Sequence, residues 1–106
     1  MPAPTPTATP TLPPPTATSA TDVTSSSFTA NWTAVSGATG YSLDVSTVSD
    51  FSRYIGGYRK LDVGNVTSRS VTGRRANKTY YYRVRAYDSS RMSDNSNVMT
   101  VTTVKN

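Results

Sequence analysis

The 106-residue chain contains no cysteine, no histidine and no glutamate. Without cysteine it can form neither a disulfide nor a thiolate metal site, so an apolar core must hold the fold together. The absence of histidine as well excludes Ser-His-Asp and Cys-His nucleophilic sites and ordinary zinc sites. Six aspartates remain as carboxyl groups, and no motif pairs two of them across a cleft. We therefore expect no enzyme activity, no catalytic residues, no bound metal and no cofactor.

Long apolar runs are also missing. No stretch is long enough for a transmembrane helix, and no apolar signal-peptide core follows Met1, so we expect any secretion signal to lie outside this sequence. Runs rich in Ala, Glu, Lys and Leu are absent as well, while Ser and Thr are abundant, which favours strands and turns over helices. The length suits one small domain.

Proline is absent after residue 15, because all seven prolines lie within the first fifteen residues. A tract so rich in proline cannot join a sheet and prefers the polyproline II conformation, which advances about 3.1 Å per residue. The sequence therefore predicts a Pro/Thr-rich linker over residues 1–15 and a folded domain over residues 16–104. Docking of the tract as a Pro-rich ligand in an aromatic groove is the alternative.

After the proline tract, apolar and polar residues alternate in short runs. The clearest runs cover residues 28–32, 41–45 and 80–86, and each presents one apolar face and one polar face. Turn residues such as Gly, Asn and Asp separate the runs. Weaker runs are Ala20–Thr24, Tyr58–Val63, Arg69–Val71 and Asn97–Val104. Seven short amphipathic strands predict an all-β, seven-stranded antiparallel β-sandwich in which the polar face of each strand is solvated.

Three of these motifs resemble the fibronectin type III family in order and spacing: Phe28-Thr-Ala-Asn-Trp32, Gly40-Tyr-Ser-Leu-Asp-Val45 and Thr79-Tyr-Tyr-Tyr-Arg-Val-Arg-Ala86. The resemblance extends over nearly the whole chain after the linker. It implies an immunoglobulin-like sandwich.

The same resemblance implies two structural residues. Trp32 is expected to be the core tryptophan of the second strand, and the hydroxyl of Tyr80 is expected to form the tyrosine corner. The most similar repeats are those of secreted bacterial polysaccharide-degrading and surface proteins. That similarity implies an extracellular or cell-surface location.

The sequence departs from the family pattern at the turn before the Tyr80 strand. The family usually has Gly-Leu-x-Pro there, whereas Gly73 is followed here by Arg74, Arg75 and Ala76. The missing Leu would have filled one end of the core. We therefore expect a less tightly packed or resurfaced end.

Two surfaces are candidate binding sites. The first is the outward face of the strand over residues 80–86, with the candidate residues Tyr81, Arg83, Arg85 and Tyr87. Aromatic rings and guanidinium groups on a flat sheet can stack on sugars or anchor a protein. The alternative is that they pair across strands, for example Arg83 or Arg85 with Asp44.

The second candidate surface is the loop that carries Arg74, Arg75 and Lys78. All but one of the eleven Lys and Arg residues lie between Arg53 and Arg91, so the charge is strongly asymmetric along the chain. Such asymmetry can mark an anion-binding face, although solvated loop charge is the simpler reading. The neighbouring residues that could join this surface are Arg53, Tyr54, Tyr58, Arg59 and Lys60.

The oxygen-bearing residues Asp88, Asp94, Asn95 and Asn97 raise calcium binding as an alternative to turn formation. No Asp-x-Asp-x-Asp-Gly spacing supports calcium, so we favour turns.

Three hypotheses for function remain open. The first is a non-catalytic spacer or interaction module of an extracellular multidomain protein, with weak glycan or protein binding. The second is an engineered or diversified binder with a loop-borne target site. The third is a structural subunit of a surface or virion assembly that docks through its N-terminal tail. The expected partners are other domains or a protein or polysaccharide surface. Nucleic acid is not expected, because no recognised binding motif accompanies the charge.

Overall fold

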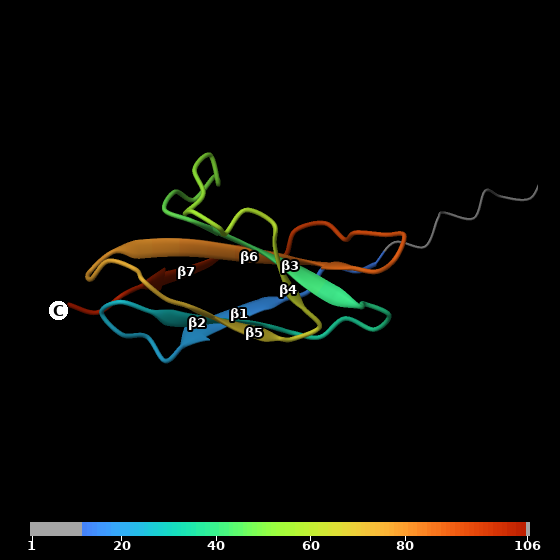
Figure 1. Ribbon diagram of the computed structural model, residues 1–106, viewed down its shortest axis with the longest axis horizontal. Helices are drawn as coiled ribbons and strands as arrows, with labels where there is room; N and C mark the ends of the chain where they lie inside the picture. Colours follow the sequence, from blue (N-terminus) through green and yellow to red (C-terminus); the bar gives the residue numbers. More distant parts are fainter. Residues whose placement is uncertain (1–11, 106) are drawn as a thin grey trace, which may run out of the picture.

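A computed structural model describes residues 12–105 of the chain, which form seven β-strands (Figure 1). The strands are β1 (Ala17–Thr21), β2 (Phe28–Trp32), β3 (Gly40–Ser46), β4 (Leu61–Gly64), β5 (Ser68–Val71), β6 (Thr79–Tyr87) and β7 (Met99–Thr102). Within residues 12–105 there is no helix that could cross a membrane.

The strands form two stacked antiparallel sheets. One sheet has the order β1-β2-β5 and the other has the order β4-β3-β6-β7. Figure 1 shows the two layers edge-on, with the long β6 strand in the upper layer. This arrangement confirms the predicted all-β sandwich.

The core lies between the two layers and draws on both sheets. Phe28, Tyr82 and Val84 are almost completely buried in it. Trp32 is also buried, its ring centre lies 6.0 Å from that of Tyr41, and its Nε1 donates a hydrogen bond of 2.9 Å to the Val66 carbonyl. The indole is therefore both packed and hydrogen-bonded, which avoids the cost of burying an unpaired N–H group.

The strong alternating runs coincide closely with β2, β3 and β6. The weaker runs are displaced: the first strand occupies residues 17–21 where the sequence indicated 20–24, and the fourth occupies 61–64 where it indicated 58–63. In these short edge strands, side-chain contacts and turns set the ends more than propensity does.

Two residues of the segment predicted as linker pack against the sandwich. Leu12 is 4% exposed and belongs to the core cluster, and Pro15 is also buried. The end of the proline tract therefore packs against the folded domain. The remainder of that tract, residues 1–11, lies outside the described residues.

The polar face of β3 departs from the alternating pattern, and here the expectation of a solvated face was wrong. Ser42, Asp44 and Ser46 are all buried although they alternate with the core residues of the strand. Part of the reason is the connection formed by residues 47–60, which returns to β3: Tyr54 bridges to Ser46, and the Lys60 amide donates to an Asp44 carboxylate oxygen. The connection thereby shields polar side chains that a bare sheet would expose.

Candidate interaction surfaces

The outward face of β6 is occupied mainly by contacts within the domain. Arg83 lies opposite Asp44 in the antiparallel register of β3 and β6, and its Nε donates to an Asp44 carboxylate oxygen at 2.9 Å. The Asp44 carboxylate also accepts the Lys60 amide at 2.6 Å. Of the two arginines proposed as partners for Asp44, the structure pairs Arg83.

Aromatic side chains of the 47–60 connection cover the same arginine. The Arg83 guanidinium carbon lies 4.0 Å from the centre of the Phe51 ring, and its Nη2 donates to the Tyr54 hydroxyl at 3.2 Å. Phe51 is buried but lies outside the main core cluster. These residues form a small second packing centre on the outside of the sheet. They hold the Arg83 side chain in place and leave only 21% of it exposed to solvent.

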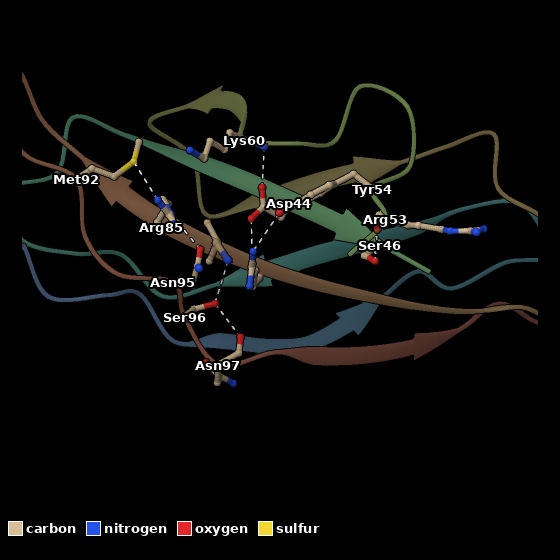
Figure 2. Close-up of polar contacts among 12 residues, drawn as sticks. Asp44, Ser46, Arg53, Tyr54, Lys60, Arg85, Met92, Asn95, Ser96 and Asn97 are labelled. Carbon is tan, nitrogen blue, oxygen red and sulfur yellow. Dashed lines mark hydrogen bonds and ion pairs between the residues drawn. The ribbon is translucent and has the colours of Figure 1, made fainter. Parts of the chain in front are cut away.

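Arg85 is held by the β6–β7 connection. Its Nε donates to the Asn95 side-chain oxygen at 2.9 Å, and its Nη1 lies 3.4 Å from the Met92 sulfur. Figure 2 shows the Arg85 side chain directed toward Asn95 and Met92, whereas Asp44 and Lys60 meet further along the sheet. Arg85 therefore positions the connection rather than projecting freely.

Tyr87 spans β3 to reach β4. Its hydroxyl donates to an Asp62 carboxylate oxygen at 2.5 Å, and its ring lies so close to Gly40 that any Cβ there would clash with it. The hydrogen bond to Asp62 raises the pKa of Tyr87 above its ordinary value, and the same bond lowers the pKa of Asp62. Gly40 is required here for close approach by a neighbouring side chain.

Tyr81 completes the predicted group. It is half-buried, and its strand neighbours are Ser46 of β3 and Thr100 of β7. The structure therefore brings Tyr81, Arg83, Arg85 and Tyr87 to one face, as the sequence indicated, and gives the last three side chains polar partners within the domain.

The second candidate surface lies at the turn between β5 and β6. The Arg74 amide donates to the Ser26 carbonyl at 2.7 Å, and its guanidinium lies 5.9 Å from the centre of the Tyr58 ring. Arg75 and Lys78 are exposed in the same turn. The turn thus meets both the β1–β2 turn and the 47–60 connection, which brings Arg74, Arg75, Lys78 and Tyr58 to one end of the sandwich.

Tyr80 anchors this turn from below. Its ring is buried beside Phe28, and its hydroxyl accepts a hydrogen bond of 2.9 Å from the Arg75 amide. This contact has the geometry of a tyrosine corner, because the hydroxyl reaches back to the backbone five residues upstream.

Sequence reasoning missed a second anchor, Thr103. Its buried hydroxyl accepts the Lys78 amide at 3.0 Å and donates to the Arg75 carbonyl at 2.6 Å. The end that lacks the family's Leu and Pro is therefore closed by hydrogen bonds. A threonine just after β7, in a stretch with several other threonines, carries no signal by which its role could have been recognised.

The β6–β7 connection is fastened in a similar way by the buried side chains of Ser93 and Ser96. The Ser96 hydroxyl accepts the Val84 amide at 2.9 Å, and the Ser93 hydroxyl accepts the Ala86 amide at 2.8 Å. Asn97 caps the edge of β1 by bonding both the amide and the carbonyl of Ala17. These hydroxyl and amide groups satisfy backbone groups beyond the paired part of β7.

Three of the four residues considered as calcium ligands, Asp88, Asn95 and Asn97, have side chains engaged in turns and edges. Asp88 accepts the amides of Ser90 and Arg91 and pairs with the Arg91 guanidinium, while Asn95 and Asn97 make the bonds described above. Within the described residues there is no group of three or more acidic or other ligating side chains suited to a metal, and no pocket opens on their surface.

Three strands on four, with a tyrosine tied back to the preceding turn, define an immunoglobulin-like β-sandwich module. The family model for the fibronectin type III domain matches residues 13–102. The chain belongs to this family. Its members are typically non-catalytic modules of multidomain proteins, mostly extracellular, and they also occur within enzymes. No curated protein matched the sequence.

Solved structures agree on the fold. The fibronectin type III domain of human fibronectin type III domain containing protein 3 is 20% identical, with a TM-score of 0.74 over 96% of this chain and 94% of that chain. The chicken CNTN1 FN1-FN3 structure is 22% identical, with a TM-score of 0.71 over 89% of this chain and 32% of that one. A β-1,2-glucanase from Parabacteroides distasonis is 20% identical, with a TM-score of 0.70 over 88% of this chain and 13% of that enzyme.

Proposed function

We propose that the chain is a rigid, non-catalytic spacer and interaction module in an extracellular multidomain protein. The observation that carries this proposal is the placement of the two ends of the described chain. Leu12 lies beside Gly37 in the β2–β3 connection, whereas the Val104 carbonyl accepts the Asn77 amide in the β5–β6 turn. These connections lie at opposite ends of the sandwich (Figure 1).

This placement suits a module joined in series. A domain attached before residue 12 and another attached after residue 105 would be separated by the length of the strands. Nine-residue β6 alone corresponds to about 30 Å. The separation is stiff because both ends are fastened to the core, at one end by buried Leu12 and at the other by Thr103.

The contacts on the outward face of β6 favour a spacer function over ligand binding at this face. Arg83 and Arg85 are engaged by Asp44 and Asn95, so a ligand would have to break those contacts before using the guanidinium groups. Breaking hydrogen bonds to charged groups costs about 1.5–3 kcal/mol each. We therefore place binding at the loops.

A polysaccharide-degrading or surface protein is the setting we propose for the module. The similarity to part of a β-1,2-glucanase supports this setting, since the matched portion is a small fraction of that enzyme. In such a protein the module would hold a catalytic or anchoring domain at a fixed distance from its neighbour.

Joining the chain between two folded reporter domains tests the spacer function. A matched control replaces residues 12–105 with a Gly/Ser linker of equal length, which behaves as a flexible coil. We expect small-angle X-ray scattering to give one narrow reporter separation with the sandwich and a broad distribution with the linker. Equal breadth for the two proteins would contradict a spacer. Polysaccharide turnover by the isolated chain would contradict its non-catalytic nature.

A further inference from the structure

One end of the sandwich collects cations that have no carboxylate partner. Segments 47–60 and 72–78 contain six Lys or Arg residues and a single Asp, Asp50. The two ion pairs found among the described residues use Arg83 and Arg91 and leave all six untouched. We name five of them the cationic end: Arg53, Arg59, Arg74, Arg75 and Lys78.

Contacts between the two segments place these charges together. The Arg74 guanidinium from the β5–β6 turn lies over Tyr58 of the 47–60 connection. That connection is in turn tied to β3, because the Val45 amide donates to the Tyr58 carbonyl at 2.9 Å and the Ile55 amide donates to the Val45 carbonyl at 3.1 Å. Figure 2 shows Arg53 in the same connection, with its side chain extending away from the sheet residues.

Two of the guanidinium groups already lie over aromatic rings. Arg59 lies 5.5 Å from the centre of the Tyr54 ring, and Arg74 lies 5.9 Å from that of Tyr58. Tyr54 is itself held by the Phe51 ring and by the Arg83 guanidinium. A long side chain fixed in this way has less rotamer entropy to lose on binding, so an anion is bound at a smaller cost.

The nearby carboxylates do not neutralise this charge. Asp50 turns its side chain to the Ser52 amide at 3.0 Å, and Asp44 is buried against Arg83 and Lys60. Asp22, exposed in the adjoining β1–β2 turn, takes part in neither of the ion pairs found among residues 12–105. The cationic end therefore keeps an excess of positive charge on exposed and half-buried side chains.

From these observations we infer that the cationic end binds a linear anionic polysaccharide. Guanidinium groups pair well with sulfate and carboxylate groups, and a linear polymer can meet several spaced charges at once. A nucleic acid is the weaker fit, because single-stranded nucleic acids gain affinity by stacking bases on aromatic side chains, and Arg59 and Arg74 already occupy faces of Tyr54 and Tyr58. The inference refines the binding part of the proposed function.

Calorimetric titration with heparin, polygalacturonate, neutral dextran and single-stranded DNA tests the inference. We expect heparin or polygalacturonate to bind in low salt and to weaken as salt increases, and dextran not to bind. Binding of heparin without polygalacturonate identifies sulfate as the recognised group. Binding of both polymers shows that carboxylate is sufficient, and binding of polygalacturonate alone shows that carboxylate is preferred. DNA binding tighter than either polysaccharide would overturn the inference, as would no binding of either polysaccharide.

Matched variants locate the site. Arg59→Gln and Arg74→Gln should each weaken binding roughly threefold, as expected for exposed charged contacts. Arg69→Gln removes the same charge from an exposed residue of β5, outside the two segments that form the cationic end, and should leave the affinity nearly unchanged. An equal loss in all three variants would show a response to net charge alone and would overturn the site.

A charge-neutral pair of variants tests the role of the rings. Tyr54→Leu keeps every charge but removes the ring beneath Arg59, so it should weaken polysaccharide binding, while Tyr54→Phe should retain it. Unchanged binding by Tyr54→Leu would overturn the claim that the rings order the site. None of these titrations affects the reporter-separation experiment, so failure of the polysaccharide site and failure of the spacer function remain distinguishable.

Discussion

At the scale of single residues, the position of the Tyr87 side chain depends on residue 40 being a glycine. The Tyr87 ring passes over Gly40 to place its hydroxyl on Asp62. A methyl group at residue 40 would occupy the position of the ring, and the ring is free to rotate outward because it lies near the surface. The contact between Tyr87 and Asp62 is therefore sensitive to a change on β3, the strand that lies between them.

Gly40→Ala should displace Tyr87 from Asp62 and return the raised pKa of Tyr87 toward about 10. Nuclear magnetic resonance titration of the tyrosine ring signals measures the change. Asp62→Asn provides the matched control, because it removes the charged acceptor while leaving Gly40 in place, and it should lower the same pKa. A Tyr87 pKa that stays raised in Gly40→Ala would show that the ring does not cross residue 40.

Trp32, in contrast to Gly40, contributes a large side chain that fills part of the core. Trp32→Ala should lower the free energy of unfolding by about 3–5 kcal/mol, because it leaves a cavity and an unpaired Val66 carbonyl. Chemical denaturation measures the loss. Trp32→Phe keeps a ring but lacks Nε1 and should lose less. A midpoint near that of the parent chain for Trp32→Ala would be incompatible with a buried indole.

At the scale of structural elements, the 47–60 connection behaves as part of the domain. Asp44 joins β3 to this connection and to β6, since its carboxylate accepts both the Lys60 amide and Arg83. Phe51, which adopts a left-handed backbone conformation with φ of 58°, packs its ring against the same arginine. Such a conformation is unfavourable for a bulky residue and is retained only where packing compensates for it.

Asp44→Ala should weaken the attachment of the 47–60 connection to β3. The half-buried Arg83 and the Lys60 amide would both lose their acceptor, and we expect stability to fall by about 2 kcal/mol. Amide hydrogen exchange should accelerate over residues 47–60 more than over β2. Asp50→Ala, a change to an exposed aspartate in the connection itself, is the control and should alter exchange little outside the local turn. If the hydrogen-exchange rate of the Lys60 amide is the same in Asp44→Ala as in the parent chain, Asp44 does not hold the connection to β3.

The sequence predicted some elements much better than others, for physical reasons. β2, β3 and β6 alternate strongly in sequence and are the inner strands of their sheets, so the burial of one face fixes a clear sequence pattern for their position. The burial of Ser42, Asp44 and Ser46 was not predictable, because it depends on how the irregular 47–60 connection folds back over β3. The sequence pattern of β3 records only its own periodicity.

The candidate surfaces divide in the same way. The alternation in β6 correctly grouped Arg83 and Arg85 on one face, but it could not show that Asp44 and Asn95 already engage them. The cation–aromatic contacts between Arg74 and Tyr58 likewise join segments far apart in sequence. Loop-to-loop contacts of this kind follow from the assembled fold and leave no periodic pattern.

At the scale of the whole molecule, the two sheets are linked by a hydrogen bond from the Tyr82 hydroxyl in β6 to the Thr18 carbonyl in β1. Tyr82 is completely buried, and burial raises its pKa above 10 by disfavouring the charged form. Since the folded-state pKa is the higher one, the contribution of Tyr82 to stability is fully present below about pH 10 and is lost as pH rises through the folded value.

Stability should therefore fall as pH rises above about 10. Urea denaturation across this range measures the fall. Tyr82→Phe cannot ionise at this position, so its stability, although lower at neutral pH, should decline less steeply. Parallel declines for the two proteins would show that Tyr82 is not the group responsible.

The spacer function requires a stiff sandwich in which residues 12 and 105 lie at opposite ends. Because the chain has no cysteine, Thr16→Cys together with Lys105→Cys allows two spin labels to be attached at defined positions. Pulsed electron paramagnetic resonance should then give one narrow distance distribution centred at about 30 Å or more, which corresponds to the length of β6. A short distance, or a broad distribution under native conditions, would contradict the spacer.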